Sequence, residues 1–411
     1  MRTIVNVLKV MVATLCLVAL AACGGGGAGG TVGSGTLRVA LTDAPSCGFD
    51  QVNITVNKVR VHQSASAGEN AAGWSDIEIS PPRKINLLDL MNGVLEELGQ
   101  TSLPAGQYTQ VRLVLERNTG GSPANSVVPT GGAEQPLDTP SAVQSGIKLN
   151  HTFTVEANKL HDIVLDFDAC RSIVMRGNGT FGLKPVIKPL PRTTTGIVGT
   201  VDVALAGVVV SAQKGGKVIR ATVPNATGEF ALLPIDPAAS PYDVVITATG
   251  RATAVIAAVP VVSDMTTRIS TTAAPISLPL PLPPPPLPLL PPPASRSVSG
   301  TVTLAPAPAA LVMPAAALAE VRALQAVGGV PKVEIAHVNV NETTGAYSLT
   351  LPIGAPVLAT YAVPLPLTFA PQGGAGQYTI EAAAESYVTQ TAAVDLSIAD
   401  ATVDFLLVLA P

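Results

Sequence analysis

Aromatic and charged side chains are scarce in this sequence of 411 residues, at 3% and 13% of the total. There is no basic run, and the formal net charge is −4, so the electrostatic footprint of nucleic-acid binding is missing. Beyond the first 22 residues, no apolar run reaches the 18 residues that indicate a transmembrane helix. We therefore expect no nucleic-acid partner and no membrane-spanning helix in the processed chain.

Motifs of catalysis and cofactor binding are missing as well. The sequence has no GxSxG, HExxH or CxxC motif and no phosphate-binding Gly-Lys-Ser/Thr loop. Its four histidines (His62, His151, His161 and His337) are too scattered to predict a metal site, although His151 and His161 would meet if they lie on one hairpin. The sequence thus predicts a protein that is not an enzyme and holds no cofactor.

One acidic cluster remains, at Asp162, Asp166 and Asp168. These residues alternate with apolar ones, so their carboxylates share one face of a predicted strand. Asp166 and Asp168 would lie roughly 7 Å apart, close enough to hold a calcium ion with a third oxygen, for example from Asp43. This spacing also approaches that of the carboxylates in inverting glycosidases, so a glycan hydrolase is an alternative. The simpler interpretation is a solvated face on which one Asp caps a turn.

The first 22 residues predict a secretory signal peptide. Arg2 and Lys9 precede an apolar run over residues 10–20, and small residues lead to Cys23. The run is too short to span a bilayer, which takes about 20 residues. Its ending, Leu20-Ala21-Ala22-Cys23, resembles the bacterial lipobox, whose cysteine is lipidated and becomes the mature N-terminus. The alternatives are an ordinary signal peptide with an accidental cysteine and a short membrane anchor.

Residues 23–35 are predicted to be a flexible tether, because eight of the twelve residues from 24 to 35 are glycine. Bacterial lipoproteins carry several acyl chains, such as palmitate, on the one cysteine, which meets the need for more than one chain. Removal of residues 1–22 takes away two basic residues and no acids, which leaves 22 basic against 28 acidic groups and a charge of −6. Gly24 stands where an Asp would favour the inner membrane, so we expect the outer membrane.

Two further cysteines need an explanation, because Cys16 leaves with the signal peptide and Cys23 carries lipid. Cys47 and Cys170 fall in one predicted domain, and in an oxidising compartment they are expected to form a disulfide. Closing so long a loop would stabilise the fold by roughly 4–5 kcal/mol. Two buried free thiols are the alternative, and a metal site is disfavoured because neither cysteine has a second Cys or His at ligand spacing.

Residues 36–191 are predicted to form an antiparallel β domain. Apolar and polar residues alternate over residues 37–41 and 52–56, which is typical of half-buried strands. The phase of this alternation changes at Asn57-Lys58, which predicts a bulge. Only residues 88–98 have helix-like spacing, so we expect one short helix at most.

Four motifs of this domain occur in an order that we recognise: Leu41-Thr42-Asp43-Ala44-Pro45, Leu103-Pro104-Ala105-Gly106-Gln107-Tyr108, Leu165-Asp166-Phe167-Asp168 and Leu183-Lys184-Pro185-Val186. In these motifs, residues 36–190 resemble the bacterial lipoprotein family catalogued as domain of unknown function 4382. The resemblance implies an extracytoplasmic domain and supplies no activity or site residue.

Residues 196–275 and 297–411 contain an internal repeat. The segment from Asn225 to Leu232 recurs as Asn341 to Leu349, each with a Thr-Gly or Thr-Thr-Gly turn followed by an aromatic residue and a leucine. The order of motifs resembles carboxypeptidase regulatory-like domains, which are seven-stranded sandwiches of Ig-like or transthyretin-like form, also called collagen-binding B-type. The second copy is stretched by residues 305–317 and 356–376. Residues 315–327 have helix propensity, but the repeat predicts a strand there.

Residues 276–295 are predicted to link the two copies. Within them, residues 279–293 consist of proline and leucine alone, which predicts a polyproline II rod of roughly 45 Å.

The predicted fold class is mainly β, with an antiparallel β N-terminal domain followed by two β-sandwich modules. The predicted function is a lipid-anchored, extracytoplasmic module for binding or display. Polysaccharide is the first ligand class, because the sandwich family resembles carbohydrate-binding folds. A structural envelope protein with a protein partner is the alternative, since Phe230 and Tyr347 are expected in cores and sugar binding usually needs exposed aromatics.

Overall fold

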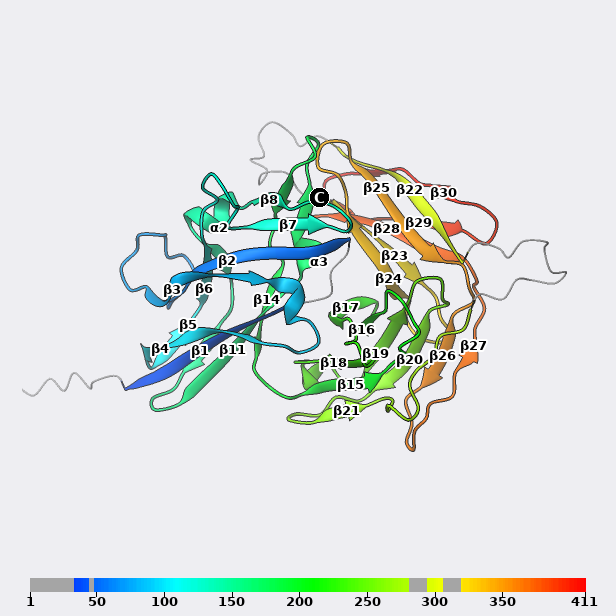
Figure 1. Ribbon diagram of the computed structural model, residues 1–411, viewed down its shortest axis with the longest axis horizontal. Helices are drawn as coiled ribbons and strands as arrows, with labels where there is room; N and C mark the ends of the chain where they lie inside the picture. The colour runs from blue at the N-terminus through cyan, green and yellow to red at the C-terminus, as the bar shows by residue number, and fades with distance from the viewer. Residues whose placement is uncertain (1–32, 44–47, 281–293, 306–318) are drawn as a thin grey trace, which may run out of the picture.

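The computed structural model describes residues 33–43, 48–280, 294–305 and 319–411. Strands make up nearly all of the secondary structure in these ranges, so the predicted mainly β fold is confirmed. Three hydrophobic cores define three units, which we call the first unit (34–191), the second unit (195–278) and the third unit (295–411). Figure 1 shows the first unit at the left, the second at the lower right and the third at the upper right.

Several predicted features lie outside the described residues: the signal peptide, Cys23, most of the tether, Cys47 and most of the proline-rich linker. None of the helices within the described ranges has the length and hydropathy needed to cross a bilayer.

The first unit contains the strands β1 (Ser34–Asp43), β2 (Phe49–His62), β3 (Ser75–Asn86), β4 (Glu96–Pro104), β5 (Gly106–Tyr108), β6 (Gln110–Leu115), β7 (Ser126–Pro129), β8 (Gln135–Asp138), β9 (Ile147–Leu149), β10 (Phe153–Val155), β11 (Leu160–Phe167), β12 (Ile173–Met175), β13 (Phe181–Leu183) and β14 (Ile187–Pro191). It also contains a 3-10 turn, η1 (Leu87–Leu90), and the short helices α2 (Pro140–Gln144) and α3 (Ala169–Ser172).

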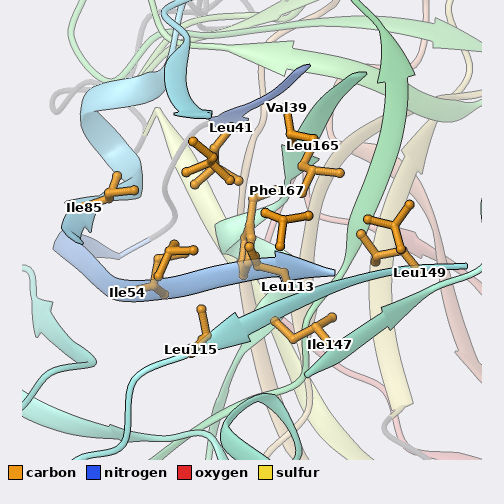
Figure 2. Packing of buried hydrophobic residues seen from close by; sticks show 14 of the residues in the cluster. Val39, Leu41, Ile54, Ile85, Leu113, Leu115, Ile147, Leu149, Leu165 and Phe167 are labelled. Carbon is orange, nitrogen blue, oxygen red and sulfur yellow. The ribbon is translucent and has the colours of Figure 1, made fainter. Parts of the chain in front are cut away.

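Two large sheets of this unit enclose one core. One has the order β14-β11-β1-β4, and the other has the order β12-β13-β8-β7-β2-β6-β9, with β3 also paired to β2. Figure 2 shows Val39 and Leu41 of β1 with Leu165 and Phe167 of β11, facing side chains from the second sheet such as Leu113. The predicted bulge is confirmed, because the register of β2 shifts between Val56 and Lys58.

The prediction of an antiparallel first domain is wrong for two strand pairs. β1 pairs with β11 in parallel, and β8 pairs with β13 in parallel. Strands joined by a tight turn must be antiparallel, but residues 44–159 separate β1 from β11 and leave their relative direction free.

The short helix predicted over residues 88–98 is limited to the single 3-10 turn η1. Asn92 and Gly93 follow with φ of +62° and +79°, a left-handed conformation that ends helical structure, and Glu96 already begins β4. The two short helices, α2 and α3, lie where the sequence pattern predicted none.

The second unit contains β15 (Gly196–Thr200), β16 (Val209–Lys214), β17 (Lys217–Thr222), β18 (Glu229–Leu232), η2 (Pro237–Ala239), β19 (Tyr242–Thr247), β20 (Ala254–Val259) and β21 (Thr266–Arg268). The third unit contains β22 (Ser295–Leu304), β23 (Ala319–Gln325), β24 (Val333–Asn339), β25 (Ala346–Pro352), β26 (Val357–Thr360), β27 (Ala370–Pro371), β28 (Gln377–Ala384), β29 (Gln390–Asp395), β30 (Ala401–Thr402) and β31 (Phe405–Leu407).

The second and third units have the same sandwich topology. Sheets β18-β15-β21 and β17-β16-β19-β20 of the second unit correspond to β25-β22-β30 and β24-β23-β28-β29 of the third. The turn glycines match as well: a Cβ on Gly228 would lie 2.2 Å from the carbonyl oxygen of Val201, and one on Gly345 would lie 2.3 Å from that of Val302. Both glycines have positive φ, so only glycine fits either turn. The strand predicted within residues 315–327 is confirmed as β23.

The insertion in the third unit completes the sheet of the second. β26 pairs in parallel with β20, and β27 pairs with β26, which extends that sheet to six strands. Val357 of β26 packs into the core of the second unit. Residues 356–376, which only stretched the repeat in the sequence, therefore hold two units together.

Candidate functional site

The polar side chains that the three units bury between them form the candidate site, which we call the central junction. It comprises Thr42, Asp166, Asp168 and Arg171 of the first unit, Gln213 and Arg220 of the second, and Arg322, Glu334 and His337 of the third. β14 and β17 lie near each other here (Figure 1). Lys188 and residues 218–221 line one small cavity together with Asp166 and Asp168.

Arg220 joins the second unit to the first. It lies on β17, is 2% exposed, and forms an ion pair with Oδ1 of Asp166, which is 7% exposed. Its Nη2 also donates to the hydroxyl of Thr42 at 3.1 Å. Burial lowers the pKa of Arg220 to about 10, although the nearby charge of Asp43 raises it. The guanidinium therefore stays charged near neutral pH and compensates carboxylates that the first unit buries.

Glu334 joins all three units. Its side chain is 2% exposed, and its Oε1 accepts from Nη2 of Arg171 at 2.7 Å and lies 3.0 Å from Nδ1 of His337. Its Oε2 lies 3.4 Å from Nη1 of Arg322. The backbone N–H of Glu334 donates to Oε1 of Gln213 at 2.8 Å, and its C=O accepts from Nε2 of Gln213 at 2.7 Å.

These partners control the protonation of Glu334. Burial alone would raise the pKa of its carboxyl group. The hydrogen bond from His337 and the charge of Arg171 outweigh burial and lower that pKa from 4.5 to about 2. Glu334 is thus an anion throughout the physiological range, and its charge is part of the junction.

The predicted acidic face is solvated only in part, because Asp166 is buried whereas Asp162 and Asp168 are half-buried. Asp162 pairs with Arg38, Asp166 pairs with Arg220, and Asp168 caps α3 by accepting from the backbone N–H of Arg171 at 3.0 Å. The interpretation that one Asp caps a turn is therefore confirmed for Asp168. Strand alternation predicts the shared side, and the second unit covers part of that side, at Asp166 and Asp168.

The metal site predicted at Asp166 and Asp168 stays a prediction. Among the described residues, the grouping with ligand atoms within 4.8 Å of one another is Asp168, Cys170 and His337. Cys170 is disulfide-bonded, so its sulfur is not a thiolate ligand. Because Cys47 lies outside the described residues, the Cys47–Cys170 pairing stays a prediction.

His151 and His161 lie close together, but not on the expected hairpin, because β10 pairs with β5 whereas β11 pairs with β1 and β14. Their rings stack on Phe153, with centroids 5.9 Å and 4.9 Å from it. Burial lowers the pKa of both imidazoles, so both favour the neutral form at neutral pH. Their contacts are those of side chains packed at the edge of the core of the first unit.

Phe230, Tyr347 and Trp74 do not form the exposed aromatic face that sugar binding generally uses. Phe230 and Tyr347 are 2% and 5% exposed, as predicted for core residues. Trp74 has the guanidinium groups of Arg60 and Arg112 each 4.8 Å from its ring centroid, and its Nε1 donates to the C=O of Gly68 at 2.9 Å. None of the three offers a bare ring to a ligand.

Comparison with known proteins identifies the first unit. Residues 34–185 match the family described as "Domain of unknown function (DUF4382)". The resemblance predicted from the four motifs is confirmed for this part of the chain, while that of the second and third units to carboxypeptidase regulatory-like domains stays a prediction. No curated protein matches the sequence.

Solved structures offer only distant likenesses. Two B repeat units of the collagen binding protein of Staphylococcus aureus match at 11% identity and a TM-score of 0.17, over 91% of this chain and 98% of theirs. The pilus adhesin SpaC of Lactobacillus rhamnosus GG matches at 7% identity and a TM-score of 0.15, over 92% of this chain and 44% of its own. The major pilin SpaD of Corynebacterium diphtheriae matches at 8% identity and a TM-score of 0.15, over 92% and 98%. Likeness at these scores supports no conclusion about function.

Three of the four motifs of the first unit contact the other units of this chain. Thr42 of the first motif and Asp166 of the third motif both contact the guanidinium group of Arg220. The fourth motif contributes Lys184 and the two residues after it to a groove of about 320 Å³, whose other wall includes Glu320 and Glu385 of the third unit. In this chain, the surface that carries the first, third and fourth motifs is therefore an interface with the other units.

Proposed function

We propose that this protein is a lipoprotein anchored to a bacterial membrane through Cys23, with its three units outside the cytoplasm as a non-enzymatic module for binding or display. The observation that carries the proposal is the central junction, which fixes three β units in one arrangement. A fixed arrangement suits presentation of a surface, because loops and strand edges of different units keep a constant spacing. The lipobox-like segment and the glycine-rich tether support the anchored location.

The geometry of the carboxylates supports a binding role over the hydrolase alternative. A glycosidase needs two carboxyl groups that face one open space, one of them free to donate a proton. Asp166 is instead paired with buried Arg220, and Asp168 caps α3. Both carboxylates thus have structural partners on the described residues.

The covered aromatic residues favour a polypeptide partner over a glycan. Sugar binding generally uses an exposed aromatic face, whereas Phe230 and Tyr347 are buried and Trp74 lies against two arginines. A carbohydrate ligand remains the second candidate, on the resemblance of the sandwich units alone.

The anchor is tested by growing bacteria that express the chain with labelled palmitate. The wild-type chain should incorporate the label and fractionate with membranes, whereas a Cys23→Ser variant should be unlabelled and released. Equal labelling of the two proteins, or none in either, would overturn the anchor.

The ligand class is tested by retention of the full chain on glycan arrays and on envelope protein extracts. Retention by proteins without retention by glycans is the expected result. Saturable binding to a glycan would instead select the second candidate.

A further inference from the structure

The outer edge of β29 differs from the corresponding edge in the second unit. β29 holds the place in the third unit that β20 holds in the second, and β26 covers the outer edge of β20. Within the described residues, β29 is the last strand of its sheet, and no strand pairs with its outer edge.

The residues of β29 are more exposed than those of β20, which has a partner strand on its outer edge. Ala254, Val255, Ile256 and Val259 of β20 are all 0% exposed. In β29, by contrast, half-buried and exposed residues alternate along the whole strand. Ala392 and Val394, which face the core of the third unit, are therefore only partly buried, so that core is incompletely closed at this edge.

The equivalence of the two units shows which backbone groups face outward. The N–H of Val357 donates to the C=O of Thr253, and that of Tyr361 donates to the C=O of Ala257, both at 2.9 Å. Odd-numbered residues of β20 thus direct their backbone groups toward β26.

The same backbone positions face outward in β29, because its register with β28 matches that of β20 with β19. Ile256 pairs with Val244 on β19, just as Ala392 pairs with Ile380 on β28. Thr391 and Ala393 consequently have their N–H and C=O groups at the open edge of β29.

Apart from the exposed Asp395 at its end, the sequence of β29 has no feature that protects this edge. Exposed edge strands usually carry lysine, proline or a bulge that blocks pairing, but Gln390–Asp395 contains no Lys, Arg or Pro, and its register with β28 is unbroken. Large apolar side chains stand near its two ends, since Val388 is 38% exposed and Ile398 is 83% exposed.

We propose that the outer edge of β29 binds an extended apolar segment of a protein partner, which adds in parallel as β26 adds to β20. The N–H and C=O groups of Thr391 and Ala393 would pair with its backbone, and its inward side chains would cover Ala392 and Val394. A four-residue strand with small and β-branched side chains suffices, because Val357–Thr360 fills the matching place. The inference names the partner class of the proposed binding function and rests on that function for its biological role.

The test uses the full chain and a fluorescent peptide with the sequence of residues 355–362, followed by anisotropy. We expect saturable binding to the wild-type chain. An Ala393→Pro variant removes an outward N–H and leaves the ladder to β28 intact, so affinity should fall at least about tenfold. The matched control Thr391→Val keeps every backbone donor and should bind within about twofold of wild type.

Three results would overturn the proposal. The first is no saturable binding to the wild-type chain at peptide concentrations up to about 1 mM, which corresponds to about −4 kcal/mol. The second is equal binding to Ala393→Pro, because the peptide would then occupy another site, such as the edge of β20. The third is a wild-type dimer in sedimentation that Ala393→Pro abolishes, since the occupant would then be a second copy.

Hydrogen exchange gives a measurement that does not depend on the folding of a variant. In the wild-type chain, the amides of Thr391 and Ala393 should exchange fast when free and about tenfold more slowly with peptide. The amide of Ala392, which faces β28, should be protected in both states. Unchanged exchange at Thr391 and Ala393 would overturn the proposal whatever the anisotropy shows. Neither readout involves the lipid anchor, so a failure here is separate from a failure of anchoring.

Discussion

Replacement of Glu334 by glutamine should destabilise the chain in a way that depends on pH. The pKa of this carboxyl group falls from 4.5 to about 2 on folding, and each pKa unit is worth about 1.4 kcal/mol, so its charged form contributes about 3 kcal/mol. Because the folded pKa lies below the unfolded one, this contribution is complete above pH 4.5 and disappears as the pH falls toward 2. Glutamine keeps the shape of the side chain and removes the charge.

The assay is urea unfolding of wild type and Glu334→Gln, followed by circular dichroism at several pH values from 7 to 2. The free energy of unfolding of the variant should be about 3 kcal/mol lower at pH 6 and should converge with that of wild type near pH 2. As a matched control, Glu156→Gln removes a carboxylate that is 60% exposed and pairs with the exposed Lys159, and it should leave the urea midpoint unchanged. A difference at pH 6 below about 1 kcal/mol, or one that stays constant down to pH 2, would refute the role of the charge.

Further substitutions test the other contacts between and within the units. Arg220→Met leaves the carboxylate of Asp166 buried without its cation and should lower the free energy of urea unfolding by about 3–5 kcal/mol. The double variant Arg220→Met/Asp166→Leu should recover most of this loss. Equal losses in the single and double variants would contradict a coupled pair. Asp168→Ala removes the cap of α3 and should cost about 1 kcal/mol, which Asp168→Asn should largely restore; no loss in Asp168→Ala would contradict the capping role. Val357→Ala shortens a side chain that is 6% exposed in the core of the second unit and should cost about 1–2 kcal/mol in thermal unfolding. Leu358→Ala changes a half-buried side chain and should cost less. The opposite order would contradict the packing of β26 into that core.

The sequence predicts the repeat because its signals are local. Gly228 and Gly345 each need a left-handed conformation next to a carbonyl oxygen, and the aromatic residue and leucine that follow each turn alternate into a core. Turn chemistry and alternation over ten residues therefore suffice to place two equivalent hairpins.

The central junction could not be predicted in the same way, because its partners are far apart in sequence. Arg220 and Asp166 are 54 residues apart, and Gln213 and Glu334 are 121 residues apart. A strand with charged residues on one face has the same alternation whether water or another unit covers that face. The one local signal is a lone charge among β-branched residues, as in Val218-Ile219-Arg220 and Val333-Glu334-Ile335, which indicates an inward-facing ion in need of a partner.

The direction of β1 relative to β11 was missed for a related reason. Alternation identifies a strand and its buried face, but both parallel and antiparallel pairing satisfy it. The choice is made by residues 44–159, whose own packing decides from which end β11 enters the sheet.

The rigid association of the three units is tested most directly by small-angle X-ray scattering of the full chain with Cys23→Ser. The Cys23→Ser protein, otherwise wild type, should scatter as one compact particle whose described residues fit the present arrangement. Adding Arg220→Met and Glu334→Gln together should raise its radius of gyration. A wild-type curve that already requires three independently moving units would contradict the central junction.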